Sequence, residues 1–176
     1  IDPIRDIEII HVELILADLE VIDARLGRLG KKAEMTKDKA TLLEVNLMKK
    51  IKESLEKNIP ARALEYTEDE LKLLKSFNLL TMKPIIYVSN VKEMEILEEN
   101  EYVKQVKAEV IVVCAKIEEE LSELEEEDKN LFLQDLGLQE SGLDQLIRAT
   151  YSLLGLATYF TEGTDEVRAW TFKKGM

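Results

Sequence analysis

An amide and a carboxylate stand three positions apart at Asn90 and Glu93, directly after a short apolar run. Residues 85–88, preceded by Pro84, have the β-branched and aromatic character of a buried strand in a parallel sheet. In open α/β sheets the ligand crevice lies just beyond the carboxyl ends of the strands. Asn90 and Glu93 could therefore offer paired hydrogen bonds to a planar ligand such as a nucleobase.

A second group of candidate residues follows another apolar run. Residues 108–113 predict a second strand, and Cys114, Ala115 and Lys116 form its small-residue tip. A charged helical crossover through residues 91–107 would join the two strands into one right-handed βαβ unit. Because such a unit places both tips on the same edge of the sheet, that edge is the predicted site.

Each of these residues also has a structural interpretation. Asn90 could merely cap the crossover helix, since short motifs arise often by chance. Cys114 could be an ordinary buried cysteine at a strand end, where it behaves as a small hydrophobic residue. His11 and Glu8 lie one helical turn apart, but His11 is the only histidine in the chain. A packed or surface histidine is therefore favoured over a metal ligand, and no metal site is predicted.

Two helices are predicted before the first strand. Residues 4–29 carry two apolar stripes at helical spacing, which predicts two neighbours for this helix. One stripe is Ile7, Ile10, Leu14, Ala17, Val21 and Ala24, and the other is Val12, Ile15, Leu19, Ile22, Leu26 and Leu29. A break at residues 30–32 and Thr36 precedes a second helix, which starts at Thr36 with Asp38 and runs to about Lys57. Its narrower apolar stripe predicts one arm of an antiparallel coiled-coil hairpin.

Caps and turns delimit the remaining elements. Thr67 and Glu70 form a capping box that opens a short helix before the first strand. Ser141 begins a helix that ends at Gly155 and closes one face of the sheet. The apolar residues of that helix are Leu143, Leu146, Ile147, Tyr151 and Leu154. Residues 166–172 alternate enough to be a strand, with no partner strand in sight.

The run from Glu118 to Asp128 contains eight acidic residues. It predicts the solvated face of a helix rather than a metal site or a cation-binding surface. The apolar positions expected on the opposite face are Leu121, Leu124, Leu131 and Phe132.

The composition favours long helices over an all-β fold, with 34% charged residues, seven glycines and three prolines. The net charge of -12 argues against a nucleic-acid surface, since phosphate binding requires clustered Lys and Arg. No apolar run approaches the roughly 20 residues of a membrane span. The single cysteine excludes an internal disulfide. A cytoplasmic protein is therefore expected.

Several ordered motifs resemble the YchF family of P-loop NTPases, which are relatives of the Obg GTPases. The similar segments are residues 83–91, 113–118, 132–143, 159–163 and 166–171, and the similarity extends back to residues 1–8. The resemblance implies that Asn90, Val91 and Glu93 belong to the first base-recognition loop. It also implies that Cys114, Ala115 and Lys116 form the second, which reads the base through backbone N–H groups while the stem of Lys116 covers the ring.

The first loop departs from the Asn-Lys-x-Asp pattern of GTPases, in which the aspartate binds guanine through two hydrogen bonds. Val91 replaces the lysine and Glu93 the aspartate. Because glutamate is one methylene longer, we expect guanine preference to be lost. The resemblance likewise implies ATP as well as or instead of GTP, bound with Mg²⁺ in the parent protein. It further implies a parent that associates with ribosomes and acts as a molecular switch.

The chain contains no Gly-x-x-x-x-Gly-Lys-Ser/Thr motif, which supplies most of phosphoryl-transfer catalysis. We therefore expect a central fragment of a YchF-type protein that neither hydrolyses nucleotide nor binds it tightly. The expected fold is α/β and predominantly helical, with a coiled-coil hairpin inserted into part of a parallel P-loop NTPase sheet. Residues 1–80 would be the helical insertion, 81–157 the end of the G domain, and 158–176 the start of a TGS domain.

A different class of function stays open on the sequence alone. The chain could be a non-catalytic module whose antiparallel coiled coil binds a protein partner, with Asn90 and Glu93 serving structure only. An unrelated Rossmann-type enzyme is disfavoured because no Gly-rich turn follows either strand. Exposed sheet edges in a fragment would also favour self-association.

Overall fold

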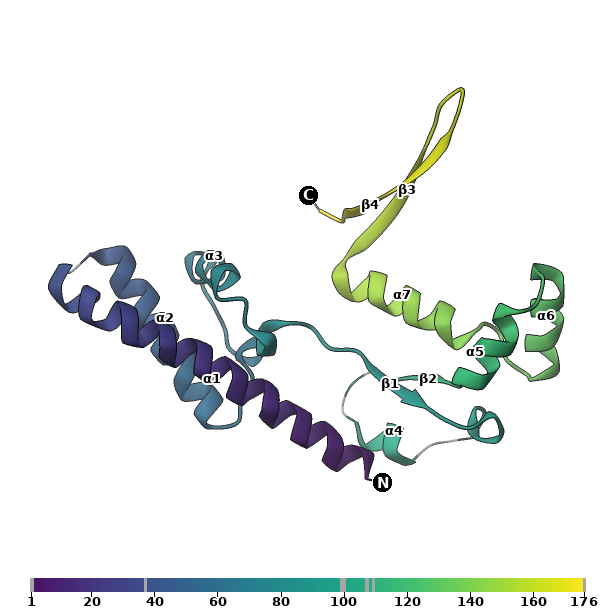
Figure 1. Ribbon diagram of the computed structural model, residues 1–176, viewed down its shortest axis with the longest axis horizontal. Helices are drawn as coiled ribbons and strands as arrows, with labels where there is room; N and C mark the ends of the chain where they lie inside the picture. The colour runs from purple at the N-terminus through teal and green to yellow at the C-terminus, as the bar shows by residue number, and fades with distance from the viewer. Residues whose placement is uncertain (1, 37, 99–100, 107, 109, 176) are drawn as a thin grey trace. The chain divides into compact units, whose positions relative to one another are not determined.

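The structure, a computed structural model, describes residues 2–36, 38–98, 101–106, 108 and 110–175. Residues 1, 37, 99, 100, 107, 109 and 176, which fall within the predicted segments, lie outside the described residues. The chain divides into two compact units, Ile1–Pro84 and Ile85–Met176. We call them the helical unit and the α/β unit, and Figure 1 shows their elements.

The helical unit is built on α1 (Pro3–Thr36) and α2 (Lys39–Glu56), which pack along each other (Figure 1). The helix α3 (Glu68–Phe77) and two short 3-10 helices, η1 (Ala61–Ala63) and η2 (Leu80–Met82), complete it. These elements bury one shared core of Ile15, Ile22, Val45, Leu47, Met48, Ile51, Leu55, Ala61, Leu74, Phe77 and Leu79.

Side-chain caps begin the three helices of this unit, and two of them, Asp38 and Thr67, lie where the sequence predicted. The carboxylate of Asp2 accepts from the amide of Arg5 at 3.2 Å, and that of Asp38 accepts from Thr41 at 3.0 Å. Thr67 caps α3 with the complete capping box. The predicted break at residues 30–32 is wrong, because α1 continues to Thr36. Glycine inside a helix costs only about 1 kcal/mol, and the neighbouring lysines are good helix formers.

Only one of the two predicted stripes of α1 is covered by the described residues. Ile15 and Ile22 of the second stripe lie in the core, but Ile10 of the first stripe is 57% exposed and Val21 is exposed too. Within the helical unit α1 therefore has two neighbouring elements, α2 and η2, but Ile10 and Val21 of the first stripe are not covered by them. The reason is that α2 and η2 both pack against a single side of α1.

A buried carboxylate that the sequence reasoning missed joins α1 to η2. Asp18 is only 1% exposed and accepts hydrogen bonds from the amides of Leu80 (2.8 Å) and Thr81 (2.7 Å). It also accepts from the Thr81 hydroxyl at 2.6 Å, while the Thr81 oxygen accepts from the amide of Ala61 at 3.2 Å. The available signal was an aspartate in the middle of the buried stripe, between Ile15 and Ile22.

The α/β unit begins with two parallel strands, β1 (Tyr87–Asn90) and β2 (Val110–Val113). Instead of one crossover helix, the described residues between them form η3 (Glu93–Glu95) and the short α4 (Glu101–Gln105). The predicted continuous helix is therefore wrong. Glu95, Glu98 and Glu101 recur at helical spacing, and like charges three residues apart destabilise a helix.

Two helices follow β2 and divide the acidic run between them. They are α5 (Ala115–Ser122) and α6 (Glu126–Asp135). Ile117, Leu121 and Leu133 are buried with Cys114 in a small core. The acidic residues stay on the surface or half-buried, as predicted. Leu131, predicted to be inside, is 60% exposed, because α6 turns Leu133 toward α5 instead.

Helix α7 (Gly142–Leu154) has the predicted ends. Ser141 caps it by accepting from the amide of Asp144 at 3.0 Å, and Gly155 ends it with a left-handed φ of 64°. Its predicted apolar face does not cover the sheet, however, because Leu143, Ile147 and Leu154 are exposed. The helix meets β2, but through the close approach at its first residues rather than through those leucine and isoleucine side chains.

The last strand has a partner, contrary to the prediction. β3 (Leu156–Glu162) and β4 (Val167–Lys173) pair in antiparallel register (Figure 1). β3 begins immediately after Gly155, in a stretch rich in aromatic and β-branched residues that favours a strand. The Trp170 indole donates to the Thr161 hydroxyl at 2.9 Å, so the cross-strand pairing is also made by side chains.

Candidate functional site

The ends of β1 and β2 lie side by side. Asn90 pairs in register with Val113, so the two strands finish at the same level of the sheet. The amide of Val91 donates to the carbonyl of Val113 at 2.8 Å and continues the ladder one residue further. Because both strands are parallel, the segments that follow them start from one edge of the sheet.

All six residues predicted for the site lie around one depression at this edge. Its volume is about 420 Å³. The residues that line it are Asn90, Val91, Lys92, Glu93, Met94, Cys114, Ala115 and Lys116. The structure therefore brings together the two segments that the sequence placed 25 residues apart, from Asn90 to Ala115.

Asn90 ties the two segments to each other. Its side-chain oxygen accepts a hydrogen bond from the backbone amide of Ala115 at 3.1 Å. This partner fixes the orientation of the side-chain amide, because a backbone N–H needs an acceptor and only the oxygen can provide one. Asn90 therefore connects the end of β1 to the segment that follows β2. Its structural interpretation was different, because there it would cap the crossover between the strands.

Glu93 and Lys116 form an ion pair at the rim of the depression. The ammonium of Lys116 lies 2.8 Å from Oε2 of Glu93 and 3.5 Å from Oε1 of Glu120. The hydrogen bond and charge of Glu93 raise the pKa of Lys116 above its ordinary value. Because the pair is solvent-exposed, its contribution to stability is small. Its main consequence is geometric, since it turns the Glu93 carboxylate toward Lys116.

Apolar groups line the inner side of the depression. Val91 and Cys114 are both buried, and Cys114 is the residue from which α5 starts. The packing of Cys114 agrees with its interpretation as a small hydrophobic residue. Met94 lines the same depression but is 88% exposed, which leaves its thioether available to a ligand. Sequence reasoning missed Met94, although it is an isolated apolar residue between two glutamates.

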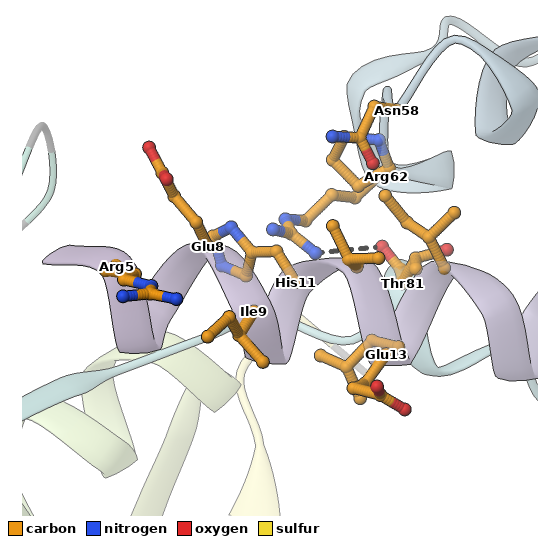
Figure 2. A pocket seen from close by; sticks show the side chains of 12 residues that line it. Arg5, Glu8, Ile9, His11, Glu13, Asn58, Arg62 and Thr81 are labelled. Carbon is orange, nitrogen blue, oxygen red and sulfur yellow. Dashed lines mark hydrogen bonds between the residues drawn. The ribbon is translucent and has the colours of Figure 1, made fainter.

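A second hollow, of about 630 Å³, lies within the helical unit and holds none of the six predicted residues. Figure 2 shows Arg62 directed toward His11, with Glu13 pointing to the opposite side of α1. The guanidinium of Arg62 donates to the carbonyl of Thr81 at 3.1 Å. His11 thus lines a mixed polar hollow. Among the described residues, no group of three or more His, Cys, Asp and Glu side chains is arranged to hold a metal ion.

None of the helices in the described ranges combines the length and the apolar character needed to cross a membrane.

Taken together, the fold and the depression define a helix-rich α/β protein with a parallel sheet. In this class, ligands bind beyond the carboxyl ends of the strands, where the six predicted residues meet.

Comparison with known proteins identifies the family. No protein-family model matches the chain. The Ribosome-binding ATPase YchF of Bacillus subtilis (strain 168) is 57% identical over 185 residues, covering 100% of this chain and 50% of that protein. The Ribosome-binding ATPase YchF of Haemophilus influenzae is 45% identical over 182 residues, covering 99% of this chain and 50% of that protein.

A solved structure agrees with these sequence matches. The YchF GTPase of Schizosaccharomyces pombe superposes with a TM-score of 0.89 at 31% identity, over 100% of this chain and 50% of that one. The chain belongs to the YchF family. It spans about half the length of the relatives that it matches.

Proposed function

We propose that the depression at the ends of β1 and β2 binds the purine base of a nucleotide, ATP or GTP, as part of a larger nucleotide-hydrolysing protein. The observation that supports this proposal is the meeting of all six predicted residues around that one depression. The names of the relatives, which are an ATPase and a GTPase, point to the same ligand class.

Each group around the depression has a role in this proposal. The Asn90 oxygen is engaged by Ala115, which leaves its amide nitrogen as the donor for the ring nitrogen N7 of a purine. Val91 and Cys114 form the apolar inner surface against which the ring lies. The aliphatic stem of Lys116 covers the ring from the rim while its ammonium stays with Glu93.

The same geometry favours adenine over guanine, the base that Asn-Lys-x-Asp loops bind tightly. Guanine would need a free carboxylate for its ring N–H and exocyclic amine, and Glu93 is directed toward Lys116 at 2.8 Å. Adenine has no 2-amino group and makes no such demand. We therefore propose that the site accepts ATP as well as or instead of GTP.

Nucleoside titration monitored by amide chemical shifts of the ¹⁵N-labelled chain tests the base site. We expect adenosine to shift the resonances of Asn90, Val91, Ala115 and Lys116, and cytidine to shift them much less. Asn90→Ala should weaken the adenosine response about tenfold, because it removes one ligand hydrogen bond and the brace to Ala115.

Asn130→Ala is the matched control, since Asn130 is an exposed asparagine of α6 whose side chain bonds only within its own helix. It should leave the adenosine response unchanged. Equal responses to adenosine and cytidine, or an Asn90→Ala variant that responds like wild type, would remove the basis of the proposal.

The larger protein around this site is also a proposal. We propose that residues 81–157 complete a nucleotide-binding G domain, that residues 158–176 begin a TGS domain, and that Mg²⁺ binds with the nucleotide phosphates elsewhere in the full protein. Residues 1–80 would then be an antiparallel coiled-coil hairpin inserted into that domain. The packing of α1 along α2 supports the last point.

We further propose that the full protein binds the ribosome, as the names of its relatives state for them, and therefore acts in the cytoplasm. The charge distribution supports the helical unit as the contact surface. Residues 1–84 carry 15 Lys and Arg against 16 Asp and Glu, whereas residues 85–176 carry 9 against 20. Because ribosomal RNA is a polyanion, the α/β unit should be repelled by it far more strongly.

Co-sedimentation with ribosomes tests this assignment. The double variant Arg28→Glu with Lys49→Glu, which reverses two charges on the helical unit, should reduce the bound fraction several-fold. The double variant Lys173→Glu with Lys174→Glu reverses the same number of charges on the α/β unit and should have little effect. Equal losses in both variants would contradict a contact through the helical unit.

A further inference from the structure

The start of α7 lies directly behind the second segment of the depression. Gly142, the first residue of α7, is buried, and its amide donates to Oε1 of Glu118 at 2.8 Å. A β carbon at position 142 would lie 2.8 Å from Cγ1 and 3.1 Å from Cβ of Val113. The 2.8 Å contact is shorter than β carbons make in proteins, so the position accepts only glycine without a shift of its neighbours.

Both contacts of Gly142 are made to the piece of chain that carries the predicted site. Val113 is the last residue of β2 and pairs with Asn90. Glu118 lies in the first turn of α5, and its amide donates to the carbonyl of Cys114 at 3.1 Å. Gly142 therefore contacts residues on both sides of Cys114, Ala115 and Lys116, which line the depression.

We propose that Gly142 and Glu118 are positioning residues for the base site, an inference that rests on the proposed function. Glu118 holds the start of α5 against α7, and the bare backbone of Gly142 lets β2 end close to that helix. Together they place the amide of Ala115 within 3.1 Å of the Asn90 oxygen. Neither residue lines the depression, so both act through the segment that does.

Amide hydrogen exchange and adenosine titration of the full chain test this proposal together. In Gly142→Ala the new methyl group should displace Val113, speed exchange at the Ala115 amide at least tenfold, and weaken the adenosine response by a similar factor. Gly27→Ala is the matched control, because Gly27 lies in α1 with no neighbouring atom within 4 Å of an added β carbon. It should change neither quantity.

Rescue separates positioning from general loss of structure. Adding Val113→Ala to Gly142→Ala removes Cγ1, the atom of the 2.8 Å contact, and should restore slow exchange at Ala115 and most of the adenosine response. Glu118→Ala, which creates no clash, should speed Ala115 exchange, whereas Glu118→Gln keeps an oxygen acceptor for the Gly142 amide and should stay near wild type.

The two readouts distinguish this inference from the base site itself. If wild-type chain fails to respond to adenosine, the proposed function fails, while Ala115 exchange still decides whether Gly142 and Glu118 position the segment. Wild-type exchange at Ala115 in both Gly142→Ala and Glu118→Ala would overturn the positioning role. Exchange that is faster in these two variants and restored by Val113→Ala supports it.

Discussion

At the scale of single residues, Asp18 joins α1 to η2 through three hydrogen bonds made by a buried carboxylate. Its carboxylate satisfies two backbone amides and one hydroxyl at distances of 2.6 to 2.8 Å in an almost water-free environment. A buried donor left without a partner costs more than an average hydrogen bond contributes. The polar part of the connection between α1 and η2 is therefore made by one side chain.

Replacing Asp18 with alanine should destabilise the chain by about 3 kcal/mol, because the amides of Leu80 and Thr81 lose their acceptor. Urea unfolding followed by far-ultraviolet circular dichroism measures the change. Asp23→Ala is the control on the same helix, since Asp23 makes only an exposed ion pair with Lys52 and should cost less than about 1 kcal/mol. Similar losses in both variants would contradict the importance of burial.

At the scale of helices and strands, the start of α3 shows how a local motif sets an element. The Glu70 carboxylate accepts from the Thr67 amide at 2.7 Å and lies 3.3 Å from the Lys50 ammonium. The backbone hydrogen bond, followed by Lys50, lowers the pKa of Glu70 below its ordinary value of 4.5. The charged carboxylate is therefore the form that stabilises the fold.

A pKa that is lower in the folded chain gives stability that is present above the unfolded value and is lost as pH falls. The stabilisation from Glu70 should thus be complete above pH 4.5 and disappear as pH drops through the folded pKa. Melting temperatures of wild type and Glu70→Gln should differ at pH 6, and the difference should shrink as the pH falls below 4.5. A difference that stays constant over this range would show that the Glu70 charge has no role.

Elements set by neighbouring residues could be predicted from the sequence, and those set by distant contacts could not. The caps Asp38, Thr67 and Ser141 begin their helices as predicted, because a cap needs only the next three residues. The strand ends near Asn90 and Val113 followed from two apolar runs, the first with a polar tip and the second with a small-residue tip. The exposed face of α7 and the pairing of β4 with β3 depend on what surrounds each element. The spacing of apolar residues in the sequence does not predict those surroundings.

The candidate site likewise has a part that could be predicted from the sequence and a part that could not. Its six residues could be selected because each lies at, or within three residues of, the end of a strand, so that local pattern and sheet topology together place them. The bond from Ala115 to Asn90 and the ion pair of Lys116 with Glu93 could not be foreseen, since each joins residues more than 20 positions apart. The contacts of Gly142 with Val113 and Glu118 are equally distant in sequence.

At the scale of the whole molecule, the proposed base site and the chemistry of hydrolysis belong to different segments of the full protein in this proposal. The 176 residues contain no Gly-x-x-x-x-Gly-Lys-Ser/Thr motif, and this loop supplies the phosphate cradle and the magnesium ligand. We expect the chain by itself to release no phosphate from ATP or GTP above the rate in buffer. A phosphate-release assay measures this, with Glu93→Ala as the control for contamination. Turnover in wild type that Glu93→Ala abolishes would contradict the expectation.

The central claim is that a purine ring lies between the two strand ends. Intermolecular nuclear Overhauser effects in the adenosine-saturated chain test it most directly. We predict contacts from the adenine H2 and H8 protons to the methyl groups of Val91, Met94 and Ala115, which line the depression. Contacts instead to His11 and Val12, in the hollow of the helical unit, or no intermolecular contacts at all, would contradict the account.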